Sequence, residues 1–285
     1  MSKLRLMSQN QWNWTENLNA WEEKGGDCSA KQRMKGHVKV LKELMPDIVG
    51  GQEVNATMQE YLKFYCMDEN LPYTLIWGNY TPLIYRADKL ILLDSEYIIF
   101  PETVNGYEGS FNDAKSKSCN LGVFQSKEDG KTFIFATTHL WWMQGTDPNE
   151  KYYQAGSDQV RTMQIHLAIQ LINKYQKKYD NCPVIFVGDL NTDYCSETVQ
   201  YALKEHSFLH AHDVAEEFAH EGNGYNNCGL KGPATKWQDL PFEDAIDHIL
   251  VRDIKKDCVR RFDRYTPEYY LCLSDHAPVF VDIEL

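Results

Sequence analysis

Short unbroken apolar runs alternate along this chain with stretches in which apolar residues recur every three or four positions. The first pattern is typical of buried strands and the second of amphipathic helices. The clearest run covers 183–187 (PVIFV) and ends abruptly on Gly-Asp-Leu-Asn at 188–191. Because it is apolar at every position, we expect a strand in the middle of a sheet covered on both faces. The clearest helical pattern covers 158–179.

The same alternation extends over the whole chain. We expect strands at 4–8, 47–51, 73–77, 83–86, 90–100, 120–125, 132–138, 183–187, 244–251 and 278–283. We expect helices at 31–45, 57–64, 158–179 and 196–204, and a long irregular segment at 210–243. Several strands follow one another too closely for a helix between them, which favours antiparallel pairing. The pattern predicts an α+β protein of two packed, mostly antiparallel sheets with helices outside.

Nothing in the composition divides the chain into separate domains. It has no Pro/Gly/Ser-rich linker, no low-complexity tract and no internal repeat, so we expect one domain over residues 1–285. The eight cysteines are scattered without a CxxC pair, which favours reduced thiols over a zinc site or disulfides. No apolar stretch is long enough to span a membrane, and the first residues lead into a short strand. We therefore expect a soluble cytoplasmic protein.

The charge balance disfavours polyanionic partners. Lys and Arg total 29 against 41 Asp and Glu, which gives a formal net charge of −12. Such a surface repels nucleic acid unless a local basic patch compensates. The longest mixed basic stretch, 112–118, is too sparse to follow a nucleic-acid backbone.

Polar residues that can bind metal or transfer protons adjoin nearly every apolar run. They are Asn10, Glu53, His139, Asp189, Asn191, Asp247, Asp275 and His276. On their own, Asp189 and Asn191 would more often simply cap the next helix through local hydrogen bonds. A cluster of carboxylates implies a cation, since two of them at about 4 Å repel by on the order of 4 kcal/mol. Oxygen ligands favour Mg²⁺ or Mn²⁺ over zinc.

Six short motifs occur in an order that is typical of one superfamily. They are QN (9–10), GQEV (51–54), TTHL (137–140), GDLN (188–191), AIDHILV (245–251) and SDHAPV (274–279). With them the chain resembles the endonuclease/exonuclease/phosphatase superfamily, which has the deoxyribonuclease I-like fold. The segments TPLIYR and KSCNLGVF resemble its deadenylase-related bacterial branch. The resemblance implies a four-layer α/β/β/α sandwich and one or two Mg²⁺ ions.

The resemblance also implies which residues hold the metal. Glu53 would be the principal ligand, with Asn10 positioning it beside the ion. Asp275 would be a further carboxylate on the metal side. All three offer oxygen atoms, as a hard divalent cation requires.

Five residues would carry out the chemistry, again as the resemblance implies. Asp189 and Asn191 would hold the attacking water and the phosphoryl oxygen, and His139 would bind phosphate or assist the leaving group. His276 and Asp247 would act as a base and its orienting carboxylate. Phosphoryl transfer needs this combination of neutralised charge and an oriented water.

Five tryptophans lie close in sequence to these residues and are our candidates for substrate binding. They are Trp12, Trp14, Trp141, Trp142 and Trp237. Aromatic walls around a phosphate site would suit a sugar, a base or a quaternary amine, although about half of the five could merely pack loops. His248 should face away from the site, and a zinc site at His210 and His212 is disfavoured because no further ligand adjoins them.

The pattern therefore predicts a Mg²⁺- or Mn²⁺-dependent phosphoester hydrolase whose partner is a small phosphorylated substrate. A nuclease acting on single-stranded ends is the alternative, with the tryptophans stacking on bases. A lipid phosphodiesterase ranks third, since no membrane-binding stretch is present. A catalytically silent phosphate-binding module is disfavoured, because no metal ligand or base is missing. The sequence indicates no protein partner.

Overall fold

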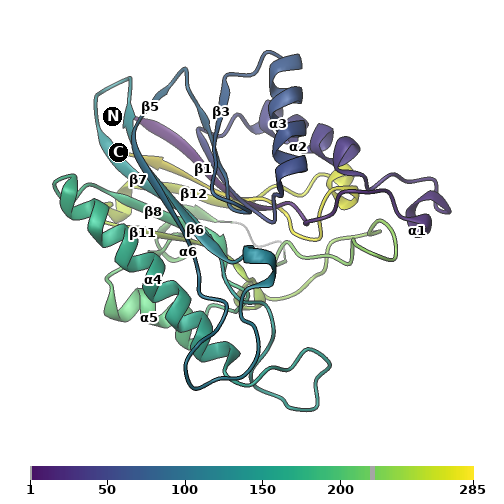
Figure 1. Ribbon diagram of the computed structural model, residues 1–285. Coiled ribbons are helices and arrows are strands. Elements are labelled where there is room, and N and C mark those ends of the chain that lie inside the picture. The colour runs from purple at the N-terminus through teal and green to yellow at the C-terminus, as the bar shows by residue number, and fades with distance from the viewer. Residues whose placement is uncertain (1, 219–221) are drawn as a thin grey trace.

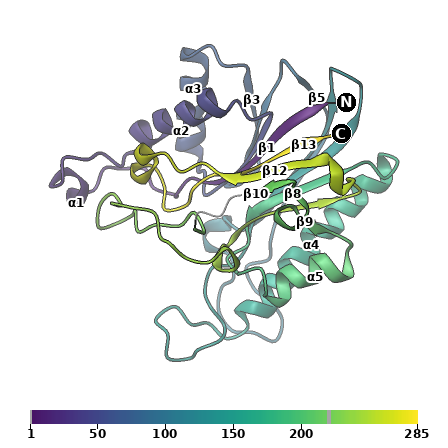
Figure 2. The ribbon, with the colours of Figure 1, turned by 180° about the vertical axis from the view of Figure 1, so that it is seen from behind.

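The fold is built from two β-sheets that pack face to face, with helices on the outer side of each (Figure 1). The computed structural model describes residues 2–218 and 222–285. The first sheet has the order β10-β12-β13-β1-β2-β4-β3. Its strands are β1 (Lys3–Asn10), β2 (Ile48–Gln52), β3 (Tyr73–Ile76), β4 (Leu83–Arg86), β10 (Glu217–Phe218), β12 (Val259–Arg264) and β13 (Val279–Glu284). Figure 2 shows β1, β13 and β12 from behind.

The second sheet has the order β5-β6-β7-β8-β11-β9. Its strands are β5 (Leu90–Ile99), β6 (Ser118–Ser126), β7 (Thr132–His139), β8 (Val184–Asp189), β9 (Leu209–His210) and β11 (Asp247–Arg252). The α-helices are α1 (Asn19–Glu22), α2 (Ala30–Leu44), α3 (Ala56–Asp68), α4 (Ser157–Lys178), α5 (Glu197–Glu205) and α6 (Ala211–Val214). None of the helices in the described residues is long and apolar enough to cross a membrane.

Three apolar layers hold the four layers of the fold together. Leu6, Phe135 and Val187 belong to the core between the sheets. A second core joins the β5-to-β9 sheet to α4 and α5, and a third joins the β1 sheet to α2 and α3. Every residue of β8 is buried, as the continuous apolar run predicts. The predicted α/β/β/α sandwich is therefore confirmed.

The strand directions bring the predicted site residues to one edge of the sandwich. β1 and β2 are parallel, as are β7 and β8, and each pair is joined by a helical crossover. Asn10 and Asp189 are the last residues of β1 and β8, and Asp189 pairs with His139 at the end of β7. β11 runs antiparallel to β8 and begins where β8 ends, so that Asp247 is opposite Asp189.

Two glycines allow the backbones to approach near this edge. A Cβ atom at Gly50 would lie 2.6 Å from the Thr137 Cβ atom and 2.8 Å from a Val187 methyl group. A Cβ atom at Gly188 would lie 2.1 Å from the Thr138 carbonyl oxygen. Since real side chains do not tolerate such contacts, glycine is required where the sheets and strands come closest.

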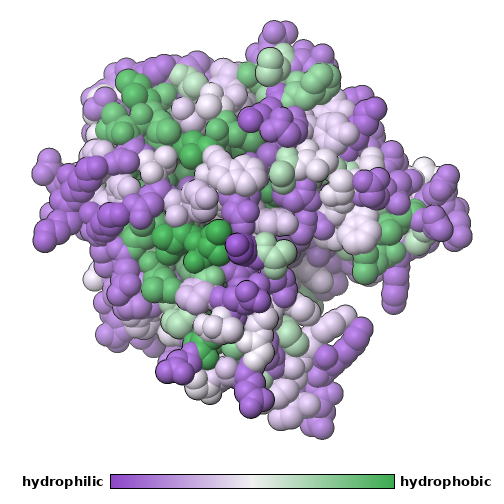
Figure 3. All heavy atoms as spheres, viewed as in Figure 1, coloured by the Kyte–Doolittle hydropathy of each residue, from purple (hydrophilic) through white to green (hydrophobic). Residues whose placement is uncertain are grey.

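The edge strand β5 carries four partly exposed apolar residues. Ile91, Leu93, Tyr97 and Ile99 of β5 are 42, 40, 42 and 39% exposed, and apolar residues gather on this face of the molecule (Figure 3). The register with β6 shifts between Leu92 and Asp94, which indicates a β-bulge. A bulge of this kind bends an edge strand and hinders pairing with another chain.

Most of the predicted elements are confirmed, and the exceptions are short or highly charged. The segment predicted to be irregular contains β10 and α6, and β9 ends at its first residue, His210. Residues 219–221 of that segment lie outside the described residues. The sequence VRRFDR of β12 was not predicted as a strand, because its charged residues obscure the buried Val259 and Phe262.

Candidate active site

Asn10 links two carboxylates that come from different sheets. Its side-chain amide nitrogen donates hydrogen bonds to Asp189 Oδ2 at 2.9 Å and to Glu53 Oε1 at 3.3 Å. Its amide oxygen accepts from the Trp12 backbone N–H at 3.0 Å, and this fixes the orientation of the amide. The structure therefore places the NH₂ group of Asn10, rather than its oxygen, against both carboxylates.

Glu53 follows β2 in a strained backbone conformation that turns its side chain into the site. Its φ angle is +59°, in the left-handed region that costs energy for a residue with a Cβ atom. Its Oε2 atom accepts from the Asn13 backbone N–H at 2.8 Å, and its side chain stays 29% exposed. Such strain persists only where the surrounding structure enforces it, and it is typical of functional sites.

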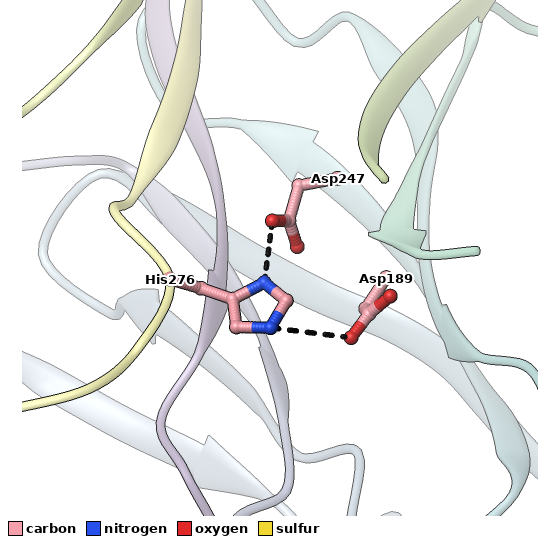
Figure 4. A group of neighbouring side chains, drawn as sticks. All are labelled: Asp189, Asp247 and His276. Atoms are coloured by element: carbon pink, nitrogen blue, oxygen red, sulfur yellow. Dashed lines mark hydrogen bonds and ion pairs between the residues drawn. The ribbon is translucent and has the colours of Figure 1, made fainter. Parts of the chain in front are cut away.

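His276 and Asp247 form a buried pair beside Asp189 (Figure 4). His276 Nδ1 lies 2.7 Å from Asp247 Oδ2, and His276 Nε2 lies 4.0 Å from Asp189 Oδ2. Burial alone would lower the pKa of His276, but Asp247, Asp275 and Asp189 raise it well above its ordinary value. Burial also raises the pKa of Asp189, with Asp247 acting in the same direction and His276 opposing it. This ring is therefore held by a carboxylate on one side and faces a second carboxylate on the other.

The donors around Asp189 fit a hard divalent cation. Burial raises the pKa of Asp275, with His276 opposing the shift and the Glu53 carboxylate adding to it. Ligand atoms of Asp189, Asp247 and His276 lie within 4.8 Å of one another, a spacing that could also hold an ion. Among the described residues, the buried Asp247 Oδ1 atom has no hydrogen-bond partner. Oxygen atoms thus predominate, as Mg²⁺ and Mn²⁺ prefer.

His139 lies between these carboxylates and a buried lysine. Its Nε2 atom is 3.6 Å from Asp189 Oδ2, 3.9 Å from Glu53 Oε1 and 2.8 Å from Lys117 Nζ. Burial lowers the pKa of His139 well below its ordinary value, and Lys117 contributes to the shift, so the ring is neutral. Burial lowers the pKa of Lys117 as well, whereas Glu53 and Asp189 raise it.

A family comparison identifies the class of protein in which this site occurs. The sequence model of the Endonuclease/Exonuclease/phosphatase family matches residues 18–276. The chain belongs to this family. It is therefore a metal-dependent hydrolase that acts on phosphate esters, as the six motifs indicated. No curated protein matches the sequence.

Several solved structures share the fold of this protein over nearly the whole of both chains. A family member from Bacteroides thetaiotaomicron is 20% identical, with a TM-score of 0.70 over 99% of this chain and 95% of that one. A mannosyl-6-phosphatase from the same species is 20% identical, with a TM-score of 0.67 over 99% and 100%. TDP2 from D. rerio, complexed with a single-stranded DNA product, is 19% identical, with a TM-score of 0.61 over 100% of both chains. At these identities the likeness shows the shared fold.

Asn191 occupies the turn that follows β8. Its φ angle is +51°, and its backbone N–H donates to Asp189 Oδ1 at 2.9 Å. Its side-chain nitrogen donates to the Leu140 carbonyl at 3.0 Å, which ties the ends of β7 and β8 together. Ser196 caps the next helix, α5, so Asp189 and Asn191 do not serve as its cap. The phosphate role of Asn191 stays a prediction.

Of the two tryptophans after His139, one is buried and the other lies at the surface. Trp141 is 2% exposed, and its Nε1–H donates to Gln154. Trp142 is 39% exposed, and its Nε1–H donates to Asp113 at 2.8 Å. The Trp142 ring also meets the exposed Tyr152 ring edge-on, with 5.2 Å between centroids. Trp142 is thus the better placed of the two to meet a ligand.

The other three tryptophans pack against the loops near the start of the chain. Trp12 stacks between Trp14 and Trp21, with 6.0 Å between ring centroids in each pair. Trp237 packs on Tyr270 at 6.0 Å and joins the same cluster of loops. Trp12, Trp14 and Trp237 each keep some exposed surface, and their role in substrate binding stays a prediction.

Three residues near the site were not among our candidates. Lys117 precedes β6 as the other site residues adjoin their strands, a signal that was available in the sequence. Tyr225 lies in the irregular segment, and its ring meets His276 edge-on at 5.5 Å. Arg33 on α2 is fully buried and donates to five backbone carbonyls, those of Gln11, Trp12, Trp14, Cys28 and Leu273. No sequence signal pointed to Tyr225 or Arg33.

Two further histidines, His210 and His248, form a structural pair behind the site. His248 Nε2 lies 2.8 Å from the Thr192 carbonyl, which can only accept, so the ring carries its proton there. His248 Nδ1 then accepts from His210 Nε2 at 3.0 Å. Burial lowers the pKa of both rings, and both are neutral in this arrangement. The pair supports the turn after Asp189 from the side away from His276.

Proposed function

We propose that this protein is a Mg²⁺- or Mn²⁺-dependent phosphoesterase whose substrate is a small phosphorylated molecule. The observation that carries the proposal is the Glu53–Asn10–Asp189 bridge beside the His276–Asp247 pair. It combines a carboxylate suited to a metal with a carboxylate and an imidazole suited to proton transfer. Glu53 and Asp275 would hold the ion, and Asn10, whose NH₂ group donates to Glu53 and Asp189, would position these carboxylates beside it.

Each residue has a role that follows from its position. The ion, when bound, neutralises phosphate charge and lowers the pKa of water. Asp189, with Asn191 beside it, holds the attacking water, and the nearby His276 ring takes part in moving its proton. Asp247 keeps the His276 ring oriented through the 2.7 Å contact. His139, which lies 3.6 Å from the same Asp189 oxygen, is on the side where the phosphate or the leaving group would bind.

Charge and surface support a small substrate. At a net charge of −12, the chain lacks the many cationic contacts that give polynucleotides their affinity. A mannosyl-6-phosphatase has the same fold, which supports a phosphorylated sugar or another ring-bearing ester. Trp142 and Tyr152 offer aromatic surface for such a ring.

A nuclease acting on single-stranded ends is the second candidate. Its support is that TDP2, which has this fold, binds a single-stranded DNA product. The exposed Trp142–Tyr152 pair could stack on a base instead of a sugar. Ionic strength separates the candidates, since oligonucleotide cleavage depends steeply on salt and hydrolysis of a small ester does not.

The test is a panel of phosphomonoesters, cyclic and linear diesters and short oligonucleotides, assayed with Mg²⁺, Mn²⁺, Zn²⁺ or chelator. We expect turnover of a small ester with Mg²⁺ or Mn²⁺ and none in chelator. Full activity in chelator, or activity with Zn²⁺ alone, would contradict the metal assignment. A much higher kcat/KM on oligonucleotides, falling steeply with salt, would replace the small-molecule proposal with the nuclease.

A further inference from the structure

Lys117 is held rigidly at the entrance of β6. The Asn112 side chain accepts from the Lys117 backbone N–H at 2.8 Å and donates to the Lys117 carbonyl at 2.9 Å. The same carbonyl accepts from the Phe100 backbone N–H at 3.0 Å. The residue is only 4% exposed. Its backbone is thus fixed at three points, and its side chain projects into the interior rather than into solvent.

The Lys117 ammonium lies over the face of the His139 ring. Nζ is 2.8 Å from His139 Nε2 and 3.3 Å from His139 Nδ1. A donor in line with one lone pair would lie much farther from the other nitrogen, because the two lone pairs point apart. The nearly equal distances therefore indicate contact with the ring face, as in a cation–π pair.

This arrangement leaves the ammonium with unused donor capacity. An ammonium has three N–H donors. In the described part of the chain, the acceptors within hydrogen-bond distance of Nζ are those two ring nitrogens, and no carboxylate pairs with it directly. Glu53, Asp189 and Asp113 are nevertheless nearby anions that stabilise its charge. A buried cation without a direct ion pair is costly, and such groups are rare outside functional sites.

We propose that the Lys117 ammonium binds a non-bridging oxygen of the substrate phosphate, with His139 as the positioning residue that holds it there. This inference rests on the proposed function and deepens it. It assigns the phosphate contact to a residue outside the six motifs and moves His139 one step away from the substrate. A lysine that only offset the charge of Glu53 and Asp189 would make no such contact.

The experiment compares Lys117→Met, which has nearly the same shape without the charge, with Lys117→Arg, which keeps the charge. Lys115→Met is the matched control, since Lys115 is exposed and lies on the same loop. Three quantities are measured for each: kcat/KM on the best ester, the dissociation constant of inorganic phosphate by calorimetry with Mn²⁺ present, and the dissociation constant of Mn²⁺ alone.

Lys117→Met should weaken phosphate binding at least about tenfold, the typical value of a hydrogen bond to a charged group. It should lower kcat/KM by at least as much without weakening Mn²⁺ binding, because removing a cation cannot reduce attraction for a metal. Lys117→Arg should retain more phosphate affinity than Lys117→Met, and Lys115→Met should match the wild type. If Lys117→Met fails to fold, a Lys117→Gln variant supplies the neutral comparison.

Unchanged phosphate affinity in a folded neutral variant would overturn the inference, even if Mn²⁺ then bound more tightly. The phosphate measurement needs no turnover, so it separates the two proposals. A wild type that hydrolyses no ester but binds phosphate through Lys117 would leave this inference standing and remove the proposed function. If the wild type hydrolyses the ester no faster than Lys117→Met, the role of Lys117 is contradicted while the proposed function stands.

Discussion

Asp189 is the carboxylate on which the other site residues converge. Asn10 donates to its Oδ2 atom, and the nearest nitrogens of His139 and His276 lie 3.6 and 4.0 Å from that atom. The Asp189 Oδ2 atom is therefore close to residues proposed to position the metal ligands, to bind the phosphate and to transfer the proton. Substitutions at this residue should affect chemistry far more than folding.

Asp189→Ala, His276→Ala and Asp247→Asn should each reduce kcat by ~10²–10⁴-fold, the usual contribution of a general acid or base. The loss should appear in kcat rather than KM, because these groups act on the transition state. Steady-state kinetics with Mg²⁺ on the best ester checks this, and circular dichroism shows that each variant is folded. Activity of His276→Ala within about threefold of the wild type would show that the pair is not catalytic.

The adjacent tryptophans after His139 should respond differently to substitution. Trp142→Ala should raise KM for a ring-bearing ester by ~5–150-fold, since an aromatic stack contributes ~1–3 kcal/mol. Trp141→Ala should lower stability by ~3–5 kcal/mol, because it removes a buried ring. KM values and urea unfolding curves distinguish the two effects. An unchanged KM in Trp142→Ala would remove the aromatic wall from the proposal.

At the scale of elements, α2 positions the site through one side chain. Arg33 of α2 binds carbonyls on both sides of Trp12 and the carbonyl of Leu273, just before Asp275 and His276. The guanidinium carbon of Arg33 also lies 4.8 Å from the centroid of the Trp12 ring. Burial lowers the pKa of Arg33 to about 10, and its five hydrogen bonds within the described residues all go to backbone carbonyls. The guanidinium thus joins the loops that carry Asn10 and His276.

Arg33→Met should destabilise the protein by about 3 kcal/mol or more, because several buried carbonyls lose their donor at once. It should also lower kcat, since the two loops are no longer held together. Urea unfolding and steady-state kinetics measure the two effects. Lys31→Met, an exposed change on the same helix, is the control and should alter neither. Equal stability of Arg33→Met and Lys31→Met would show that the loops carrying Asn10 and His276 keep their positions without Arg33.

The elements predicted well from the sequence are those whose burial is visible locally. The run before Gly188 is apolar on both sides, so β8 and the position of Asp189 at its end followed from the sequence alone. β12 could not be recognised, because its arginines pair with acidic residues that are distant in sequence, such as Glu216 and Glu284. Strand ends are local features, whereas pairing partners are set by the fold.

Residues that depend on several loops were harder to predict than residues at strand ends. Trp141 and Trp142 are neighbours of identical type, and only the packing of Phe111 and Tyr152 around them decides which is buried. Lys117 offered a positional signal but no charge pattern, since its role depends on a ring twenty-two residues away. Such distinctions require the tertiary structure.

At the scale of the whole molecule, acid should destabilise the fold through buried neutral histidines. His37 accepts from Gln9 at its Nδ1 atom, and burial, with Arg33 contributing, lowers its pKa well below the ordinary value. The unfolded chain takes up this proton near pH 6.5, whereas the folded chain does not. The unfolded state therefore binds more protons below that pH, and stability falls as the pH falls.

The wild type should lose ~2 kcal/mol more stability than His37→Gln between about pH 6.5 and pH 5, since the variant lacks one group that must stay neutral. Comparing the two proteins cancels the groups that titrate in the opposite direction, such as Asp189 and Asp275, whose pKa is raised. Urea unfolding in chelator at several pH values measures the difference. Parallel pH profiles would show that His37 is protonated in the folded state.

The site is built from both sheets, so the turnover rate depends on how the two sheets are positioned relative to each other. Asn10 and Glu53 come from one sheet, and Asp189, His139 and Asp247 from the other, so the Asn10–Asp189 contact bridges the seam between them. Gly50 lets the sheets close to contact distance just behind that seam. A methyl group at Gly50 would contact Thr137 and Val187 and push the two sheets apart. Both sheets would keep their own hydrogen bonds while the enzyme lost its activity, far from any residue that touches the substrate.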